Sequence, residues 1–227
     1  MSEDPTSRFA RLVGRPDAEI PLDEGALLIA SHAYPGLDVA GQLARLDDIA
    51  AACPDATLDS MRQHLFGVLG FRGNTTRYAD PRNSFLNDVL DRRTGIPISL
   101  AVVTMEVGRR LGLSLQGVGM PGHFLVRHQE EPPVLFDPFG GGRVVTVTEC
   151  EELFRSVHGP GAPFDPSLLA PVGARAILTR MLANLRHLYQ SVGDARSLGW
   201  VLELRMSVPG SSPYELADVA SAQAALG

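Results

Sequence analysis

The chain has 227 residues, a formal net charge of −6, 44% hydrophobic residues and 20% charged residues, values typical of a globular protein. No apolar run approaches the roughly 20 residues of a membrane-spanning helix, and the polar N-terminus predicts no signal peptide. Every cationic side chain is an arginine; the scatter of these arginines and the acidic balance disfavour nucleic-acid binding, and the lack of lysine excludes Schiff-base chemistry on a protein amine.

Cysteine and histidine usage predicts no metal site and no cofactor. Cys53 and Cys150 are too few for a disulfide framework or a metal cluster, so a reducing cytoplasm is expected. His123 and His128 are five residues apart and face opposite sides of an expected strand, so they do not chelate one ion.

The first part of the chain is predicted to be helical. Residues 1–20 are polar, with two prolines and a glycine, and predict a flexible arm. Apolar residues at helical spacing then predict helices over 25–32, 39–53 and 58–69, and Asp38 is suited to cap the second of them.

A loop over 70–82 leads to two further predicted helices. Ser84 is expected to cap a helix over 85–93 that ends at Gly95. Pro97 suits the first turn of the next helix, 98–111, which is apolar on most sides and should therefore be buried.

Four strands are predicted next, over 115–118, 123–127, 134–137 and 143–147, with a glycine turn at 140–142. Thr148 and Glu151 have the spacing of a capping box for a helix over 150–157. A buried helix followed by an antiparallel sheet is α+β order rather than repeated βαβ units.

The remaining residues are expected to form a separate tail. A linker rich in proline and glycine, 159–171, precedes helices predicted over 174–190, 195–206 and 213–226. The helix-turn-helix unit is about the length of a tetratricopeptide repeat, so residues 172–227 are interpreted as a tetratricopeptide-like helical tail.

Three of the predicted elements, the start of the buried helix and two strands after it, have the arrangement of a catalytic triad. A helix N-terminus favours an anionic nucleophile, a histidine on a neighbouring strand can take its proton, and an acid on the next strand can orient the imidazole. His123 and Asp137 are fourteen residues apart on successive predicted strands, which makes their contact geometrically natural. This is the layout of papain-like and transglutaminase-like enzymes.

The motifs that carry the resemblance are long and contiguous: YADPRNSFLNDVL, RRTGIPISLAVVTMEVGRRLGL, GVGMPGHFLVR and DPFGGGR. With them, residues from about 25 to 157 resemble the bacterial transglutaminase-like proteins of the SirB type, and the domain is expected over residues 21–158. The resemblance implies a transglutaminase-like core, with His123 and Asp137 as the second and third members of its triad, followed by tetratricopeptide-like helices.

The nucleophile of that family is missing. Cysteine-bearing members open the helix with Gly-x-Cys-x-x-x-Ala; Gly95 and Ala101 match here, but Pro97 holds the cysteine position. Ser99 is the alternative nucleophile, although it lies about 200° around the helix from Pro97. Its other interpretation is a hydroxyl that satisfies a free backbone group.

Cys150, near a helix start where a thiol pKa can fall, is a further alternative nucleophile. Asn83 and Asn87, near the start of the family motif, either cap and tether the loop or donate hydrogen bonds into the cleft. The candidate binding residues are Asn83, Asn87, Pro97 and Phe124.

Three functions follow from this pattern. The first is a non-catalytic regulatory or accessory protein that binds a peptide or protein segment in the cleft. The second is a hydrolase or an acyl- or amide-transferring enzyme that uses Ser99, or a water activated by His123 and Asp137. The third is a structural interaction module whose C-terminal helices bind a protein partner. Neither nucleic acid nor membrane is expected as a partner.

Overall fold

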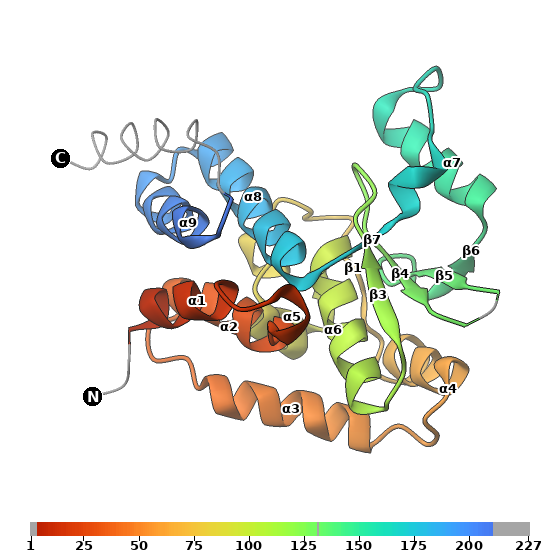
Figure 1. The fold of residues 1–227 in the computed structure, drawn as a ribbon, viewed down its shortest axis with the longest axis horizontal. Coiled ribbons are helices and arrows are strands. Elements are labelled where there is room, and N and C mark those ends of the chain that lie inside the picture. Colours follow the sequence, from red (N-terminus) through yellow and green to blue (C-terminus); the bar gives the residue numbers. More distant parts are fainter. Residues whose placement is uncertain (1–3, 131, 211–227) are drawn as a thin grey trace.

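The computed structural model describes residues 4–130 and 132–210, and it confirms the predicted α+β fold. Helix α6 (Pro97–Arg110) runs through the middle of the molecule. Figure 1 shows most of the other helices on one side of α6 and the β-sheet on the other. Within the described residues, no helix combines the length and the apolar character needed to cross a membrane.

The helical half begins earlier than expected. The flexible arm predicted for residues 1–20 is, from Pro5 to Val13, the helix α1, and a short 3₁₀ turn follows at Asp17–Glu19. Phe9 is fully buried, and α1 packs against helix α2 (Leu22–Ala33). The polar composition concealed an amphipathic helix, so the prediction of a loose arm was wrong for the described part of the segment.

Helices α3 (Val39–Ala51) and α4 (Leu58–Arg62) occupy the predicted positions, and Asp38 caps α3 through a hydrogen bond from the Gly41 N–H. The helix predicted to continue to residue 69 instead changes to a π-helical segment, Gln63–Val68. Val68 is therefore 67% exposed, although the apolar spacing predicts that it is buried.

Helix α5 (Leu86–Arg92) leads into α6. Its predicted caps were wrong, since Ser84 makes no capping bond and the C-cap is Arg93, a residue with left-handed φ of 53°, rather than Gly95. A 3₁₀ turn, Pro81–Asn83, precedes α5. The short parallel strands β1 (Arg72–Gly73) and β2 (Thr94–Gly95) then hold the preceding loop beside the start of α6.

The main sheet has the order β6-β5-β4-β3-β7, and its neighbouring strands are antiparallel. Its strands are β3 (Leu115–Val118), β4 (Leu125–His128), β5 (Val134–Asp137), β6 (Arg143–Val145) and β7 (Pro171–Val172). The strand expected from His123 begins two residues later, and β7 begins at the last residue of the expected linker.

Helix α7 (Val147–His158) covers a small second core that contains Cys150, Phe154 and Leu169. Its capping box is made by Thr146 and Glu149. The predicted pair, Thr148 and Glu151, has the same spacing two residues later, and so placed the helix start too late.

The C-terminal helices are not a separate tail. Helices α8 (Ala174–Val192) and α9 (Ala195–Ser207) pack against each other and contribute buried residues such as Leu178 to the main core. The expected linker carries a 3₁₀ turn, Pro166–Leu169, and ends at the first residue of β7. The third predicted helix, 213–226, lies outside the described residues.

Candidate functional site

His123 and Asp137 meet where β4 begins and β5 ends. The imidazole Nε2 lies 2.9 Å from Asp137 Oδ1, and the Asp137 side chain is only 4% exposed. His123 stands in the turn before β4, where its backbone N–H donates to the Met120 carbonyl at 3.1 Å. Asp137 ends β5, the neighbouring strand. The pairing predicted from the sequence is therefore present, although the histidine lies in a turn rather than on the strand.

Asp137 is held by the segment that follows it. Its Oδ1 also accepts the Phe139 N–H at 3.0 Å, so the carboxylate is fixed by one backbone and one imidazole contact. The bond to Nε2 leaves Nδ1 as the ring nitrogen that can address a ligand.

Phe139 links the histidine to the preceding loop. Its ring lies edge-on to the imidazole of His123 at 6.0 Å and to the ring of Tyr78 at 6.1 Å. A Cβ at Gly73 would come within 2.5 Å of the Phe139 ring, so this close approach requires glycine. The aromatic contacts thus place Tyr78 on the same side of the sheet as His123.

The amino end of α6 is fixed by a buried hydrogen-bond network. The hydroxyl of Ser99 donates to the Asn83 carbonyl at 2.6 Å and accepts the Ile96 N–H at 3.1 Å. Ser99 is fully buried. Its hydroxyl therefore satisfies backbone groups, as one of the two predicted interpretations requires, and in this conformation it is not presented to a substrate.

Asn83 extends this network instead of lining a cleft. It is fully buried, accepts from the Asn74 amide at 3.0 Å, and donates to the carbonyls of Arg77 and Tyr78 at 2.7 and 3.1 Å. Its contacts are those of a tether for the loop that carries Tyr78. Asn87 is also buried, and its Oδ1 has no hydrogen-bond partner among the described residues.

A cavity of about 190 Å³ joins the parts of the site. Pro97, the first residue of α6, lines it together with His123. The ring that replaces the expected cysteine thus shares a cavity wall with the histidine. The full lining is Tyr78, Pro97, Ile98, Gly122, His123, Phe124, Arg180 and Asn184.

Sequence reasoning missed the contribution of α8. Arg180 Nη2 donates to the carbonyls of Met120 and His123, each at 2.8 Å, and the guanidinium lies 5.4 Å from the centroid of the Phe124 ring. The prediction of a separate tail hid this contact, because nothing in the local pattern around Arg180 indicates that the helix reaches the histidine turn.

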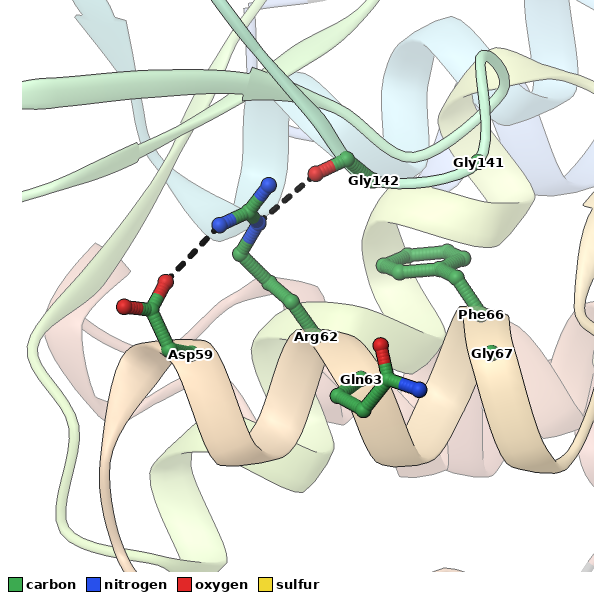
Figure 2. A pocket seen from close by; sticks show the side chains of 7 residues that line it. All are labelled: Asp59, Arg62, Gln63, Phe66, Gly67, Gly141 and Gly142. Atoms are coloured by element: carbon green, nitrogen blue, oxygen red, sulfur yellow. Dashed lines mark hydrogen bonds and ion pairs between the residues drawn. The ribbon is translucent and has the colours of Figure 1, made fainter.

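A second cavity, of about 460 Å³, lies between α4, the π-helical segment and the glycine turn at 140–142 (Figure 2). Arg62 donates from Nε to the Gly142 carbonyl at 2.7 Å and pairs with Asp59 at 2.9 Å. The Phe66 ring lies under the turn, where a Cβ at Gly142 would clash with it. Its lining does not include His123, so it is distinct from the candidate site.

Neither cysteine lines the cavity that contains His123. Burial raises the pKa of Cys150 to about 11, the opposite of the decrease that a helix start was expected to produce. Cys53 is partly buried near the end of α3. Among the described residues, no group of three or more histidine, cysteine or acidic side chains is arranged to hold a metal ion.

Related proteins occur in bacteria and in humans. A UPF0162 protein of Xylella fastidiosa is 42% identical over 188 residues, covering 76% of this chain and 66% of the relative, just under two thirds of its length. A UPF0162 protein of Pseudomonas aeruginosa is 36% identical over 182 residues, with the same coverage. Human F-box only protein 21 is 34% identical over 149 residues, 62% of this chain but 23% of that protein.

No solved structure was found to match the chain. The family model described as "Transglutaminase-like superfamily" matches residues 36–183, which extends past the domain end expected at residue 158 and into α8. Because this match covers more than half of the sequence, the chain belongs to the transglutaminase-like superfamily.

Proposed function

We propose that the protein is a cytoplasmic, non-catalytic accessory factor of the SirB type that binds a peptide or protein segment in the cavity beside His123. The observation that carries the proposal is the shared wall of Pro97 and His123. The histidine and its buried acid are in place, while the helix start presents a ring with no attacking atom.

The relatives are compatible with this proposal without naming an activity. The bacterial proteins are described only as UPF0162 proteins. The similarity to F-box only protein 21 covers 23% of that longer protein, so the same domain also occurs as one part of a larger protein. A domain used in that way suits a binding role within an assembly.

The test is a nuclear magnetic resonance (NMR) footprint of a peptide selected from a random display library against the full-length protein. The proposal expects saturable shifts at His123, Phe124 and Tyr78, and mass spectrometry should show the peptide intact after long incubation. Cleavage or acyl transfer would instead support the enzyme alternative. A footprint confined to other surfaces would reject binding in the cavity.

The enzyme alternative remains open through a water activated by His123 and Asp137, since their hydrogen bond orients the imidazole as general-base catalysis requires. Ser99 is the less accessible candidate, because its hydroxyl is buried and bonded to the backbone.

The third alternative is binding through a tetratricopeptide-like α8–α9 pair, which the packing of these two consecutive helices against each other would allow. Deleting these helices is not a clean test, because they supply core residues. Charge reversal at the exposed α9 residues Arg196 and Glu203 is a better one. If that variant no longer binds the selected peptide while His123→Ala still does, the result would favour binding through the α8–α9 pair.

A further inference from the structure

Arg180 has donors beyond those that hold the histidine turn. A guanidinium carries five N–H groups, and the two bonds to the carbonyls of Met120 and His123 both come from Nη2. The donors on Nε and Nη1 are not used in these bonds. Since Arg180 also lines the cavity of about 190 Å³, its guanidinium is part of the wall that a ligand would contact.

The charge of Arg180 is not balanced nearby. Among the described residues it forms no ion pair, and none of the residues that line the cavity is acidic. The carboxylate of Asp137, which lies behind His123, is already bonded to the imidazole and to a backbone N–H. The partly buried Arg110, at the C-terminal end of α6, differs because it pairs with both Asp23 and Glu106.

Burial also affects the ionisation of Arg180. It lowers the pKa of Arg180 from its usual value; the nearby Tyr78 opposes that change, and no carboxylate does. A partly buried cation without a counter-ion is costly, and an anionic group entering the cavity would relieve that cost.

The rest of the cavity wall selects the kind of anion. Tyr78 and Asn184 offer hydrogen-bond donors, while Pro97 and Phe124 supply apolar surface. The volume is below the roughly 300 Å³ typical of sites for whole small ligands, so it suits a terminal group. One guanidinium balances the single charge of a carboxylate but not the double charge of a dianion. Because both Nη2 hydrogens already bond carbonyls, the contact comes from an N–H on Nε or Nη1.

We propose that this cavity binds a carboxylate of the peptide segment, with Arg180 as its charge partner and Tyr78 and Asn184 as further donors. The proposal deepens the function proposed above and rests on it. The carboxyl end of a peptide and an acidic side chain share this chemistry. A neighbouring groove of about 380 Å³, which also includes Tyr78 and Asn184 in its lining, adjoins the cavity and provides room for the residues next to the carboxylate.

The experiment is an NMR titration of the full-length protein, observed at the Arg180 Nε–H and at His123. N-acetylglycine represents the carboxyl end of a peptide, N-acetylaspartate N-methylamide an acidic side chain, N-acetylglycinamide the neutral control and inorganic phosphate a dianion. The variants are Arg180→Gln, Arg180→Lys and the matched control Arg175→Gln. Arg175 lies on the same helix and donates to two carbonyls, those of Val13 and Arg15, near α1.

A carboxylate probe should bind saturably to the wild-type protein, with the amide and Arg180→Gln each weaker by at least about tenfold. Arg180→Lys should retain part of the affinity, and Arg175→Gln should retain all of it. The acid-to-amide comparison uses the unaltered protein, so it stands even if Arg180→Gln disturbs the turn.

Equal binding of acid and amide, preference for phosphate, or unchanged affinity in Arg180→Gln would overturn the inference. A selected peptide that occupies the cavity equally well with a neutral side chain and an amidated end would leave the proposed function intact while rejecting the carboxylate. Failure of every selected peptide to reach the cavity would instead reject the proposed function.

Discussion

His123 Nε2 and Asp137 Oδ1 lie 2.9 Å apart, and the same carboxylate oxygen accepts the Phe139 N–H at 3.0 Å. One buried oxygen therefore fixes both the imidazole and the loop that carries Phe139, whose ring lies edge-on to the imidazole. The pair is the structural basis of the candidate site, because it orients the imidazole that lines the cavity.

Replacing Asp137 by alanine should destabilise the fold as well as the site. The imidazole and the Phe139 N–H would both lose their acceptor in a partly buried position, which costs up to about 1–3 kcal/mol for each group left unsatisfied. Urea unfolding measures the loss. Asp59→Ala, which removes a 91% exposed carboxylate, is the control and should change the free energy of unfolding by less than about 0.5 kcal/mol. Similar values for the two variants would contradict this account.

Ser99→Ala separates a structural hydroxyl from a catalytic one. The Ile96 N–H would lose the nearer of its two acceptors and keep the Asn83 carbonyl at 3.3 Å, so we expect about 0.5–1.5 kcal/mol of destabilisation with peptide binding retained. Thr104→Val removes another buried hydroxyl of α6. That hydroxyl donates to the Leu100 carbonyl of the same helix, so we expect this variant to lose less stability than Ser99→Ala. A fluorophosphonate probe should leave wild-type Ser99 unlabelled; labelling there would support the serine alternative.

Pro97→Cys tests whether the helix start is still suited to a nucleophile. The new thiol would stand at the first residue of α6 and on the wall shared with His123, where the helix dipole and the imidazole favour the thiolate. We expect alkylation by iodoacetamide that is fast at neutral pH, with an apparent thiol pKa below the usual value of about 8.5. The wild-type protein gives the background, in which Cys150 reacts slowly because burial raises its pKa to about 11. An ordinary thiol at position 97 would show that the geometry no longer supports this chemistry.

The sequence predicted the His123–Asp137 pair better than it predicted the segments that pack around this pair. The order of α6, β4 and β5 and the pairing of His123 with Asp137 follow from local patterns and from the motif resemblance. The fold class was confirmed for the same reason, since apolar periodicity determines which elements form. Asn83 was harder to assign, because capping and cleft binding use the same residue type.

What local patterns could not provide is the packing of distant segments. Arg180 and Tyr78 reach the cavity only because α8 and the loop before α5 pack against α6 in three dimensions. The predicted arm was wrong for a related reason: the polar face of α1 dominates its composition, while Phe9 enters the core that also contains residues of α9.

Near the C-terminal end of α6, a buried carboxyl group makes the stability of the fold depend on pH. Burial, followed by the nearby Asp23 carboxylate, raises the pKa of Glu106 to about 7. Arg109 and Arg110 both pair with Glu106. Burial alone would raise the pKa of Asp23, but the hydrogen bond from Arg110 holds that pKa below its usual value. Between pH 4.5 and 7 the folded protein therefore keeps a proton on Glu106 that the unfolded protein has released, so the stability that Glu106 contributes falls as pH rises through this window.

Glu106→Gln should remove this part of the pH dependence. We expect the difference in unfolding free energy between variant and wild type to shift in favour of the variant by about 1–3 kcal/mol from pH 5 to pH 8. Glu203→Gln, which alters an exposed carboxylate on α9, is the control and should give a profile parallel to the wild type. A parallel profile for Glu106→Gln as well would show that Glu106 is ionised in the same range in both states.

The most direct measurement is calorimetric binding of a library-selected peptide to the wild-type protein and to His123→Ala, with thermal unfolding recorded for both. The account predicts an affinity loss of at least about tenfold while the melting temperature stays within a few degrees, because the imidazole contacts the ligand at the cavity wall. Unchanged affinity in a folded His123→Ala protein would contradict the claim that this cavity is the binding site.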